Sequence, residues 1–258
     1  MLKRIKTFFN WKVTVFKNLD PDLICKEGFV LHHHLGLGDV ICLYGLVAEL
    51  HKLYPNTQIH IPVKKAYLNS ANFLYKHLNG KYKIFIVDFH EMDDELTQVE
   101  SYALKNHLNI LRIGFDSLSL PFHYEMFFNQ IQVNPQVSWD NFPQLMDHPD
   151  AINLFDKLSG HDDYRLIVNQ NSDGSFALKG IAENDPRNII LHITDSEIGI
   201  FSWIAIMKKA REIHSVGTAA FHLIDHLELN TDTELYFHNV RHDIHTVTPR
   251  HDWKVIEY

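Results

Sequence analysis

The sequence predicts an α/β protein built from two Rossmann-like, doubly wound halves that face each other across a cleft. Apolar stretches of strand length alternate with amphipathic stretches of helical period over residues 26–143, and the same alternation begins again over residues 144–258. Between them, residues 134–143 contain two prolines and no clear period, which is typical of an interdomain linker. The 258 residues suffice for one large domain or two smaller ones, and the repeated alternation favours two.

The first half opens with a strand at residues 29–31 that runs into the turn Gly36-Leu37-Gly38-Asp39 and a helix over residues 40–50. Its later elements are strands at 59–63, 84–87 and 110–113 and helices at 65–78, 95–106 and 122–133. Strands that alternate with helices form a parallel sheet with right-handed crossovers.

The second half repeats this pattern. Its expected elements are strands at 164–168, 188–193 and 234–237, helices at 201–213 and 218–229, and a short segment at 214–216. Within the helix at 201–213, the side chains of Trp203, Met207, Ala210 and Ile213 should share one face.

The composition excludes several classes of protein. With 24 Lys and Arg against 32 Asp and Glu, the net charge is −8, so we expect no nucleic-acid partner. A hydrophobic fraction of 45% indicates a globular protein, and no stretch is apolar enough to span a membrane. The two cysteines, Cys25 and Cys42, form no metal or redox motif, and we expect a cytoplasmic protein.

Residues 1–25 form a basic N-terminal extension in which lysines and an arginine surround Phe8, Phe9, Trp11 and Phe16. Such a segment could lie on an anionic membrane surface, or it could pack against the rest of the protein. Peripheral membrane contact through this extension therefore stays open.

Histidine is unusually frequent, at 19 residues, which raises the question of a metal site. The spacing argues against one: residues 90–94 are not an HExxH motif, and no cysteine or carboxylate completes a set with His32, His33 and His34. We interpret these three as a strand end with alternating faces. A local cluster of His242, Asp243 and His245 is interpreted as surface.

The turn at residues 36–39 follows the first strand, where open α/β sheets bind ligands. A dinucleotide-binding fingerprint is disfavoured, because Ile41 stands where a third small residue is needed and lysines, not an acid, end the second strand. The glycines could instead let an acceptor approach the backbone. Asp39 would then be a base whose pKa the helix dipole lowers, or it could serve only as an N-cap.

A second candidate site lies at residues 217–219, where small residues open a helix directly after a strand. Free backbone N–H groups at such a helix start can bind phosphate. Thr218 could add a hydroxyl and His222 a ring N–H, or these two could be an N-cap and a buried core residue. The loop at residues 169–175 is polar, and Lys179 is the nearest cation, with Arg187 and Arg211 behind it.

Two segments carry a family resemblance. HLGLGDVICLYGLVAEL resembles the opening of GT-B glycosyltransferases of the heptosyltransferase-like kind (family 9), and AREIHSVGTAAFHLID resembles their late donor-binding motif. Thr218, His222 and Leu223 match that motif, but Gly217 stands where those families have aspartate. FHYEMFF, SWDNF and the same late segment also resemble a looser group of uncharacterised phage and bacterial glycosyltransferase-like proteins.

The resemblance implies a compact GT-B-like fold and an inverting, metal-independent glycosyltransferase that moves a sugar from a nucleotide diphosphate to a hydroxyl of a glycan or lipid-linked acceptor. Asp39 would be the base, and Gly36, Gly38 and His34 would contact the acceptor. The donor would be a substrate, with no further cofactor and no metal. Its expected contacts are Asn169, Asn171, Lys179, Glu212, His214, Gly217, Thr218, Ala219 and His222.

Two alternatives remain open at this point. The chain could be a catalytically inactive GT-B-like module that binds glycans or nucleotides, which the glycine at position 217 favours. It could also be a nucleotide-sugar epimerase, although the second paired carboxylate that such an enzyme needs is not evident.

Overall fold

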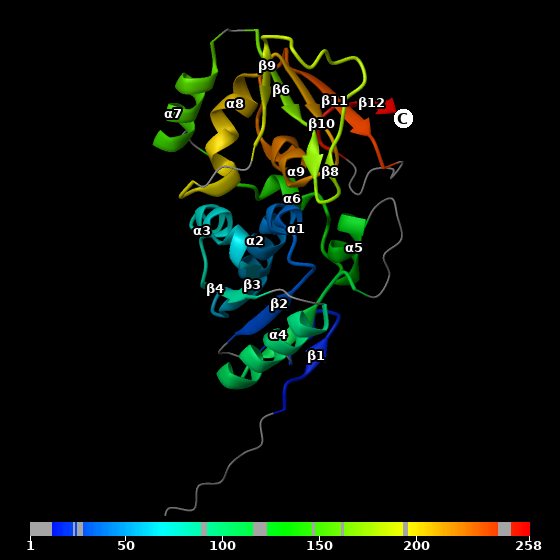
Figure 1. The fold of residues 1–258 in the computed structure, drawn as a ribbon. Helices are drawn as coiled ribbons and strands as arrows, with labels where there is room; N and C mark the ends of the chain where they lie inside the picture. Colours follow the sequence, from blue (N-terminus) through cyan, green and yellow to red (C-terminus); the bar gives the residue numbers. More distant parts are fainter. Residues whose placement is uncertain are drawn as a thin grey trace, which may run out of the picture.

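A computed structural model describes residues 12–22, 24, 28–88, 92–115, 123–145, 148–160, 163–192, 196–241 and 249–258, with the backbone alone at 92–94 and 123. The chain forms two five-stranded parallel sheets, one in each half (Figure 1). The predicted α/β class and the two Rossmann-like halves are thereby confirmed. In the described part of the chain, no helix combines the length and the apolar character needed to cross a bilayer.

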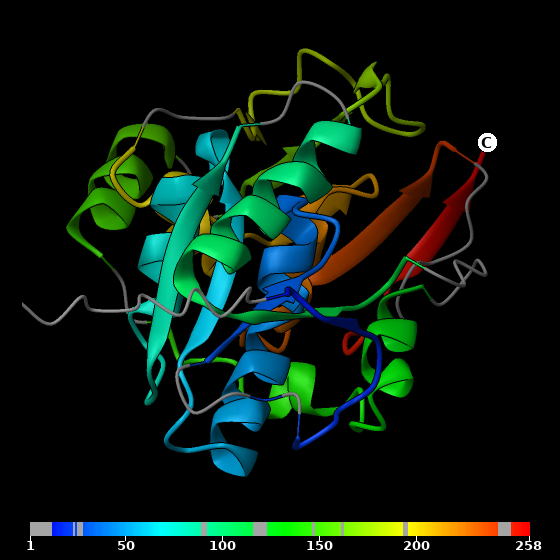
Figure 2. The same cartoon turned by 90° about the horizontal axis from the view of Figure 1, so that it is seen from below.

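The first sheet has the strand order β1-β5-β2-β3-β4. Its strands are β1 (Val15–Phe16), β2 (Phe29–His32), β3 (Ile59–Lys64), β4 (Tyr82–Val87) and β5 (Asn109–Arg112). Its helices are α1 (Leu37–Cys42), α2 (Tyr44–Leu53), η1 (Lys65–Tyr67), α3 (Leu68–Tyr75) and α4 (Met92–Asn106). Figure 2 shows helices on both faces of this sheet, which explains why β2 is buried along its whole length.

The second sheet has the order β12-β11-β10-β6-β9. Its strands are β6 (Arg165–Val168), β9 (Asn188–Ile190), β10 (Glu212–Ser215), β11 (Glu234–Asn239) and β12 (Lys254–Glu257). A small hairpin pairs β7 (Gln170–Asn171) with β8 (Gly174–Ser175). The helices are α7 (Pro149–Leu158), η2 (Gly199–Trp203), α8 (Ile204–Lys209) and α9 (Ala219–His226).

In the sequence, α5 (His123–Gln130) and α6 (Val137–Asp140) follow β5 and precede α7, the helix that leads into the second sheet. The predicted linker, residues 134–143, thus contains the short helix α6, which packs against α2. One hydrophobic cluster includes residues of both sheets, so the halves share a core.

The buried carboxylate of Asp225, in α9, ties distant segments together. It accepts hydrogen bonds from the indole N–H groups of Trp139 (3.2 Å) and Trp253 (3.1 Å) and from the backbone N–H groups of Arg250 (2.9 Å) and His251 (3.2 Å). Four donors around one buried carboxylate satisfy it fully. They attach both α6 and the segment that leads into β12 to α9.

The predicted helix at 201–213 is wrong at its C-terminal end. Helix α8 stops at Lys209, the backbone of Ala210 is extended, and Ile213 pairs with Leu166 and Leu235 inside the sheet. The boundary was missed because only two residues separate α8 from β10. The apolar Ile213 of the strand happens to fall at a position that continues the helical spacing of α8. Strands β1 and β12 and helix α7 were not predicted, and the helix at 40–50 divides at Leu43 into α1 and α2.

Candidate functional site

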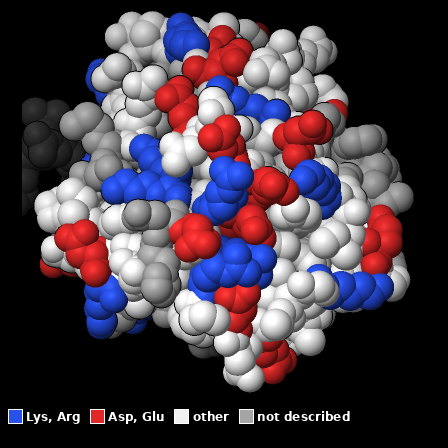
Figure 3. All heavy atoms as spheres, turned by 90° about the horizontal axis from the view of Figure 1, so that it is seen from above, with Lys and Arg blue, Asp and Glu red and all other residues white. Residues whose placement is uncertain are grey.

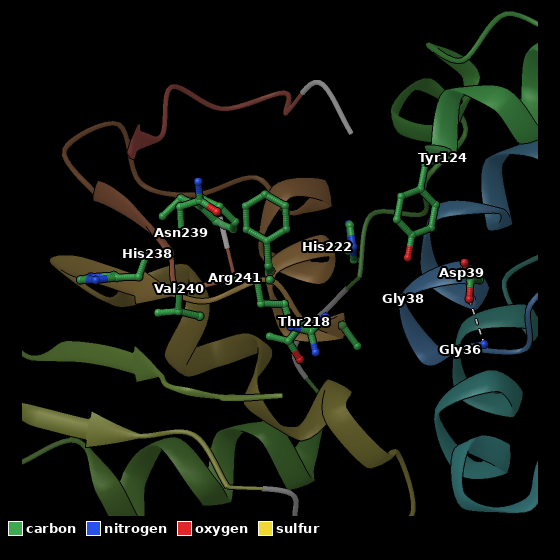
Figure 4. A pocket seen from close by; sticks show the side chains of 14 residues that line it. Gly36, Gly38, Asp39, Tyr124, Thr218, His222, His238, Asn239, Val240 and Arg241 are labelled. Atoms are coloured by element: carbon green, nitrogen blue, oxygen red, sulfur yellow. Dashed lines mark hydrogen bonds between the residues drawn. The ribbon is translucent and has the colours of Figure 1, made fainter. Parts of the chain in front are cut away.

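A cavity of about 220 Å³ lies between the two halves. It is bordered by the N-termini of α1 and α9, by α5, by the residues that follow β10, and by the end of β11 with the two residues after it (Figure 4). Its lining residues are Gly36, Gly38, Asp39, Tyr124, Gly217, Thr218, Ala219, Phe221, His222, Phe237, His238, Asn239, Val240 and Arg241. Both glycine-containing segments that the sequence singled out therefore face one cavity.

Asp39 is held by the backbone that turns β2 into α1. Leu35 adopts a left-handed conformation (φ 57°) just before this turn, and its N–H donates to Nδ1 of His33 at 3.2 Å. Gly36, not Asp39, is the N-cap of α1. Asp39 lies at the third helical position, and its Oδ2 accepts the Gly36 N–H at 2.9 Å. A Cβ at residue 36 would stand 2.5 Å from that oxygen, so any other residue there would displace the Asp39 carboxylate.

Burial controls the ionisation of Asp39. The side chain is 5% exposed, and loss of hydration raises its pKa from 3.8 to about 7. Hydrogen bonds from the Gly36 N–H and the Tyr124 hydroxyl and the charge of Lys64 act in the opposite direction but do not compensate. The expectation that the helix dipole lowers this pKa is therefore corrected: desolvation outweighs the dipole. A carboxyl group with a pKa near 7 suits a general base at neutral pH.

Tyr124 and His222 converge on the same turn from the two halves. A Cβ at Gly38 would lie 2.9 Å from Cδ2 of His222 and 3.0 Å from Oη of Tyr124, so only glycine fits without displacing them. The two rings meet edge to face with centroids 4.7 Å apart. Burial and the nearby Asp39 carboxylate raise the pKa of Tyr124, which keeps its hydroxyl protonated. Asp39, Tyr124 and His222 thus form one buried polar group.

On the other side of the cavity, residues 217–219 open α9. Thr218 is its N-cap in extended conformation, and its side chain makes no capping hydrogen bond. A Cβ at Gly217 would meet Phe237 only at 3.9 Å, an ordinary contact, so the fold itself does not demand glycine there. The backbone N–H groups at the start of α9 and the Thr218 hydroxyl are suited to bind an anion.

The sequence pattern did not indicate that the end of β11 and the two residues after it contribute to the site. Phe237, His238 and Asn239 in β11, followed by Val240 and Arg241, line the cavity because the carboxyl ends of neighbouring parallel strands meet at one sheet edge. These lining residues could have been predicted from the strand expected at 234–237. In a parallel sheet, the residues at the carboxyl end of that strand lie on the same edge as residues 217–219.

Five of the expected donor contacts lie outside the cavity lining, and the first three are Asn169, Asn171 and Lys179. The side-chain amide of Asn169 donates to the Phe176 carbonyl at 3.2 Å, and Oδ1 of Asn171 accepts the Asp173 N–H at 2.8 Å. Both stabilise the polar loop itself. Nζ of Lys179 donates to the carbonyl of Glu257 at 2.7 Å and stacks on the Tyr258 ring, so this cation is already bound by the C-terminal strand.

Glu212, an expected donor contact, lies at the start of β10, at the opposite end of the strand from the cavity, and is not among the lining residues. Its carboxylate binds Nε of Arg165 at 2.5 Å, and Arg165 also pairs with Asp185 at 3.0 Å. The reason is the strand boundary: β10 starts at Glu212, not after it. Figure 3 views the molecule from this end and shows Lys and Arg interspersed with Asp and Glu, without a patch of one sign.

His214 is separated from the cavity by His238. Its Nδ1 lies 3.0 Å from Nε2 of His238, whose Nδ1 in turn lies 2.9 Å from Oη of Tyr258. The His214 ring stacks on Tyr236 at 4.5 Å. Burial lowers the pKa of His214 below its ordinary value, and it lowers the pKa of His238 to about 4. Burial thus favours the neutral form of both imidazoles.

The expected acceptor contact His34 packs against the rings of Phe115 (4.7 Å) and Phe127 (5.2 Å) and does not line the cavity. Burial lowers its pKa. His32 pairs with Glu95 at 3.0 Å, and burial lowers the pKa of His33 to about 3. Among the described residues, no group of three or more His, Cys, Asp and Glu side chains could hold a metal ion.

Several sequence features lie outside the described residues. They are Cys25, the stretch 89–91 with its histidine, the HDxH cluster at residues 242–245 and the first eleven residues of the basic extension.

Comparison with known proteins identifies the fold. No protein-family model matches the sequence, and no curated protein matches it. The structure is similar to a glycosyl transferase family 9 protein from Veillonella parvula DSM 2008, with a TM-score of 0.56, 10% identity, and coverage of 92% of this chain and 87% of that one. It is also similar to the E. coli ADP-heptose lps heptosyltransferase II, with a TM-score of 0.53, 9% identity and coverage of 89% and 90%.

At this level of identity the comparison establishes the fold alone. The chain has the two-domain, GT-B-like architecture that the sequence resemblance implied, and it has it over nearly its whole length. Chemistry must be argued from the cavity itself.

Proposed function

We propose that the protein is an inverting glycosyltransferase that moves a sugar from a nucleotide diphosphate to a hydroxyl group, without a metal ion. One observation carries this proposal: a single cavity between the halves joins a carboxylate with a pKa near 7 to the start of a helix that can bind phosphate. The shared fold with two glycosyltransferases is consistent with it.

In this reaction Asp39 accepts the proton of the acceptor hydroxyl. The acceptor oxygen forms a bond to the anomeric carbon of the sugar while the bond from that carbon to the phosphate oxygen breaks. The electron pair of the broken bond leaves with the nucleoside diphosphate. A single displacement of this kind inverts the anomeric configuration. Tyr124 donates a hydrogen bond to Asp39 and so orients the carboxylate.

The donor's phosphates bind at the start of α9, where the helix dipole, the Thr218 hydroxyl and the ring of His222 face the cavity. The related families carry an aspartate at the position of Gly217, as the resemblance above implies. A glycine here leaves the backbone open and removes a negative charge beside the phosphates, which favours anion binding.

The two alternatives make different demands on the cavity. The epimerase reading requires a second carboxylate paired with the first, and among the described lining residues Asp39 is the only carboxylate. An inactive binding module needs no base, and for such a module the burial of a carboxylate next to Tyr124 and His222 would have no use. The glycine at position 217 remains the observation in favour of that module.

We further propose that the acceptor is a glycan or a lipid-linked hydroxyl compound bound on the Asp39 side, and that the protein acts in the cytoplasm. Val15 and Phe16 pair with β5, and the Phe16 side chain lies in the core, so any contact with a membrane surface is proposed only for the basic residues that precede β1.

A thermal-shift screen with UDP, GDP, ADP, CMP and dTDP tests the donor class, because a ligand at 100 times its Kd stabilises a protein by about 2.7 kcal/mol. Nucleotide sugars with the responding base are then assayed for release of the nucleotide, with Asp39→Asn as the base-deficient variant. Binding without turnover in the wild type would favour the inactive module, and silence across the screen would overturn the donor assignment.

A further inference from the structure

Arg241 is the only Lys or Arg among the described residues that line the cavity. It is the second residue after β11 and lies on the same side of the cavity as Thr218, across from Asp39 and Tyr124 (Figure 4). The expected cation, Lys179, is committed to the C-terminal strand. An anion bound at the start of α9 would therefore share the cavity with one permanently charged cation, the guanidinium of Arg241.

At present the Arg241 guanidinium binds the hairpin of β7 and β8. One of its terminal nitrogens lies 2.5 Å from Oδ2 of Asp173 and 2.9 Å from Oγ of Ser172. The side chains of Arg241 and Asp173 are 34% and 57% exposed. An ion pair this exposed is weak, because water solvates both charges. A diphosphate, with more negative charge and with bidentate geometry for a guanidinium, can displace such a partner.

Few contacts of the β7–β8 hairpin would oppose the replacement of Asp173 by a diphosphate at the Arg241 guanidinium. Within the described part of the chain the two strands of the hairpin pair with each other alone, and none of the lining residues of the cavity belongs to the hairpin. Asp173 also accepts a hydrogen bond from the neighbouring Ser172 hydroxyl (3.3 Å), and its backbone N–H donates to Asn171 (2.8 Å).

We propose that Arg241 binds the diphosphate of the donor, and that Asp173 of the β7–β8 hairpin competes with the donor for this guanidinium. The inference rests on the proposed function and adds to it a specific cation and a competing carboxylate. When the bond between the anomeric carbon and the phosphate oxygen breaks, that oxygen keeps the electron pair, and Arg241 neutralises the added charge. Occupancy of the donor site releases the hairpin.

The two partners of the ion pair should respond in opposite directions. Titration calorimetry on the full chain uses the nucleoside diphosphate that gives the largest thermal shift, its parent nucleoside and inorganic pyrophosphate. Arg241→Ala should weaken diphosphate binding roughly 10- to 100-fold and leave nucleoside binding nearly unchanged. Asp173→Asn should tighten diphosphate binding about 2- to 5-fold, since it removes a competitor worth at most a weak surface pair.

The double variant isolates the competition. Asp173→Asn should have no effect on affinity once residue 241 is alanine, because the two substitutions act on one contact. Arg187→Ala is the matched control: this arginine pairs with Asp185 away from the cavity, and its loss should not change any of the three affinities. Circular dichroism of each variant confirms that it is folded.

Two results would overturn the inference: unchanged diphosphate affinity in Arg241→Ala, or a gain from Asp173→Asn that persists in the double variant. The pyrophosphate arm separates this inference from the proposed function. If no nucleoside diphosphate binds but pyrophosphate binds and depends on Arg241, the nucleotide-sugar function fails and the anion site stands. If pyrophosphate does not bind, or binds equally well to the wild type and to Arg241→Ala, the proposed anion site at Arg241 is wrong as well.

Discussion

Replacement of Asp39 by asparagine should raise stability and lower activity together. In the folded state the pKa of Asp39 is about 7, whereas the ordinary value is 3.8. Between these two values the unfolded chain loses a proton that the folded chain retains, so wild-type stability falls as the pH rises through this window. At 1.36 kcal/mol per pKa unit, the penalty reaches about 4 kcal/mol at pH 8 and is about 2 kcal/mol at pH 5.

Asparagine resembles the protonated acid: it is neutral, and its carbonyl oxygen can still accept the Gly36 N–H. The free energy of unfolding of Asp39→Asn relative to wild type should therefore grow by roughly 2 to 3 kcal/mol between pH 5 and pH 8. Turnover should meanwhile fall about 100-fold or more, the usual contribution of a general base.

Urea unfolding of both proteins at several pH values, together with nucleotide-release assays, measures the two effects. The exposed Asp232→Asn is the control and should show no growth of the difference with pH. A stability difference that stays flat from pH 5 to pH 8 would refute the raised pKa. Unchanged turnover would reduce Asp39 to a residue that stabilises the helix start.

Three further variants test other parts of the structure. His222→Ala should weaken nucleoside diphosphate binding by about 1 to 3 kcal/mol, with little effect on the nucleoside; calorimetry that finds both ligands equally affected would contradict a phosphate contact. Lys179→Ala should leave diphosphate affinity unchanged, since the ammonium group of Lys179 binds the carbonyl of Glu257. A tenfold loss of diphosphate affinity in this variant would show that Lys179 does contact the donor. Asp225→Ala leaves four N–H donors, among them the buried indole of Trp253, without their acceptor and should destabilise the fold by about 3 to 5 kcal/mol in urea; a loss below about 1 kcal/mol would show that its hydrogen bonds matter little.

The sequence was sufficient to predict the order of strands and helices in most of the chain, because each buried parallel strand is a short apolar run that ends at a turn. Where two elements follow each other closely, that rule fails. At residues 204–215 the helix and the strand are separated by two residues and are both apolar, so the period alone could not divide them. The strands β1 and β12 are too short or too exposed to stand out.

The candidate site was predictable where backbone geometry forms it and not where side chains form it. Glycine-containing turns after strands pointed to Asp39 and Thr218, because parallel topology fixes the sheet edge on which they lie. Tyr124 and Arg241 could not be found in this way. Their place in the cavity depends on how α5 packs against α1 and on the residues after β11, and these are long-range contacts without a local signature.

The shared core sets limits on how ligands can enter and leave. A rotation that separates the halves about a hinge would have to withdraw the His222 ring from the backbone of Gly38 and divide a continuous apolar cluster. Both steps cost contacts that no ligand replaces. We therefore expect ligand exchange to proceed through the existing mouth of the cavity, with local motion of surface segments in place of the large domain swing that a two-lobed shape suggests.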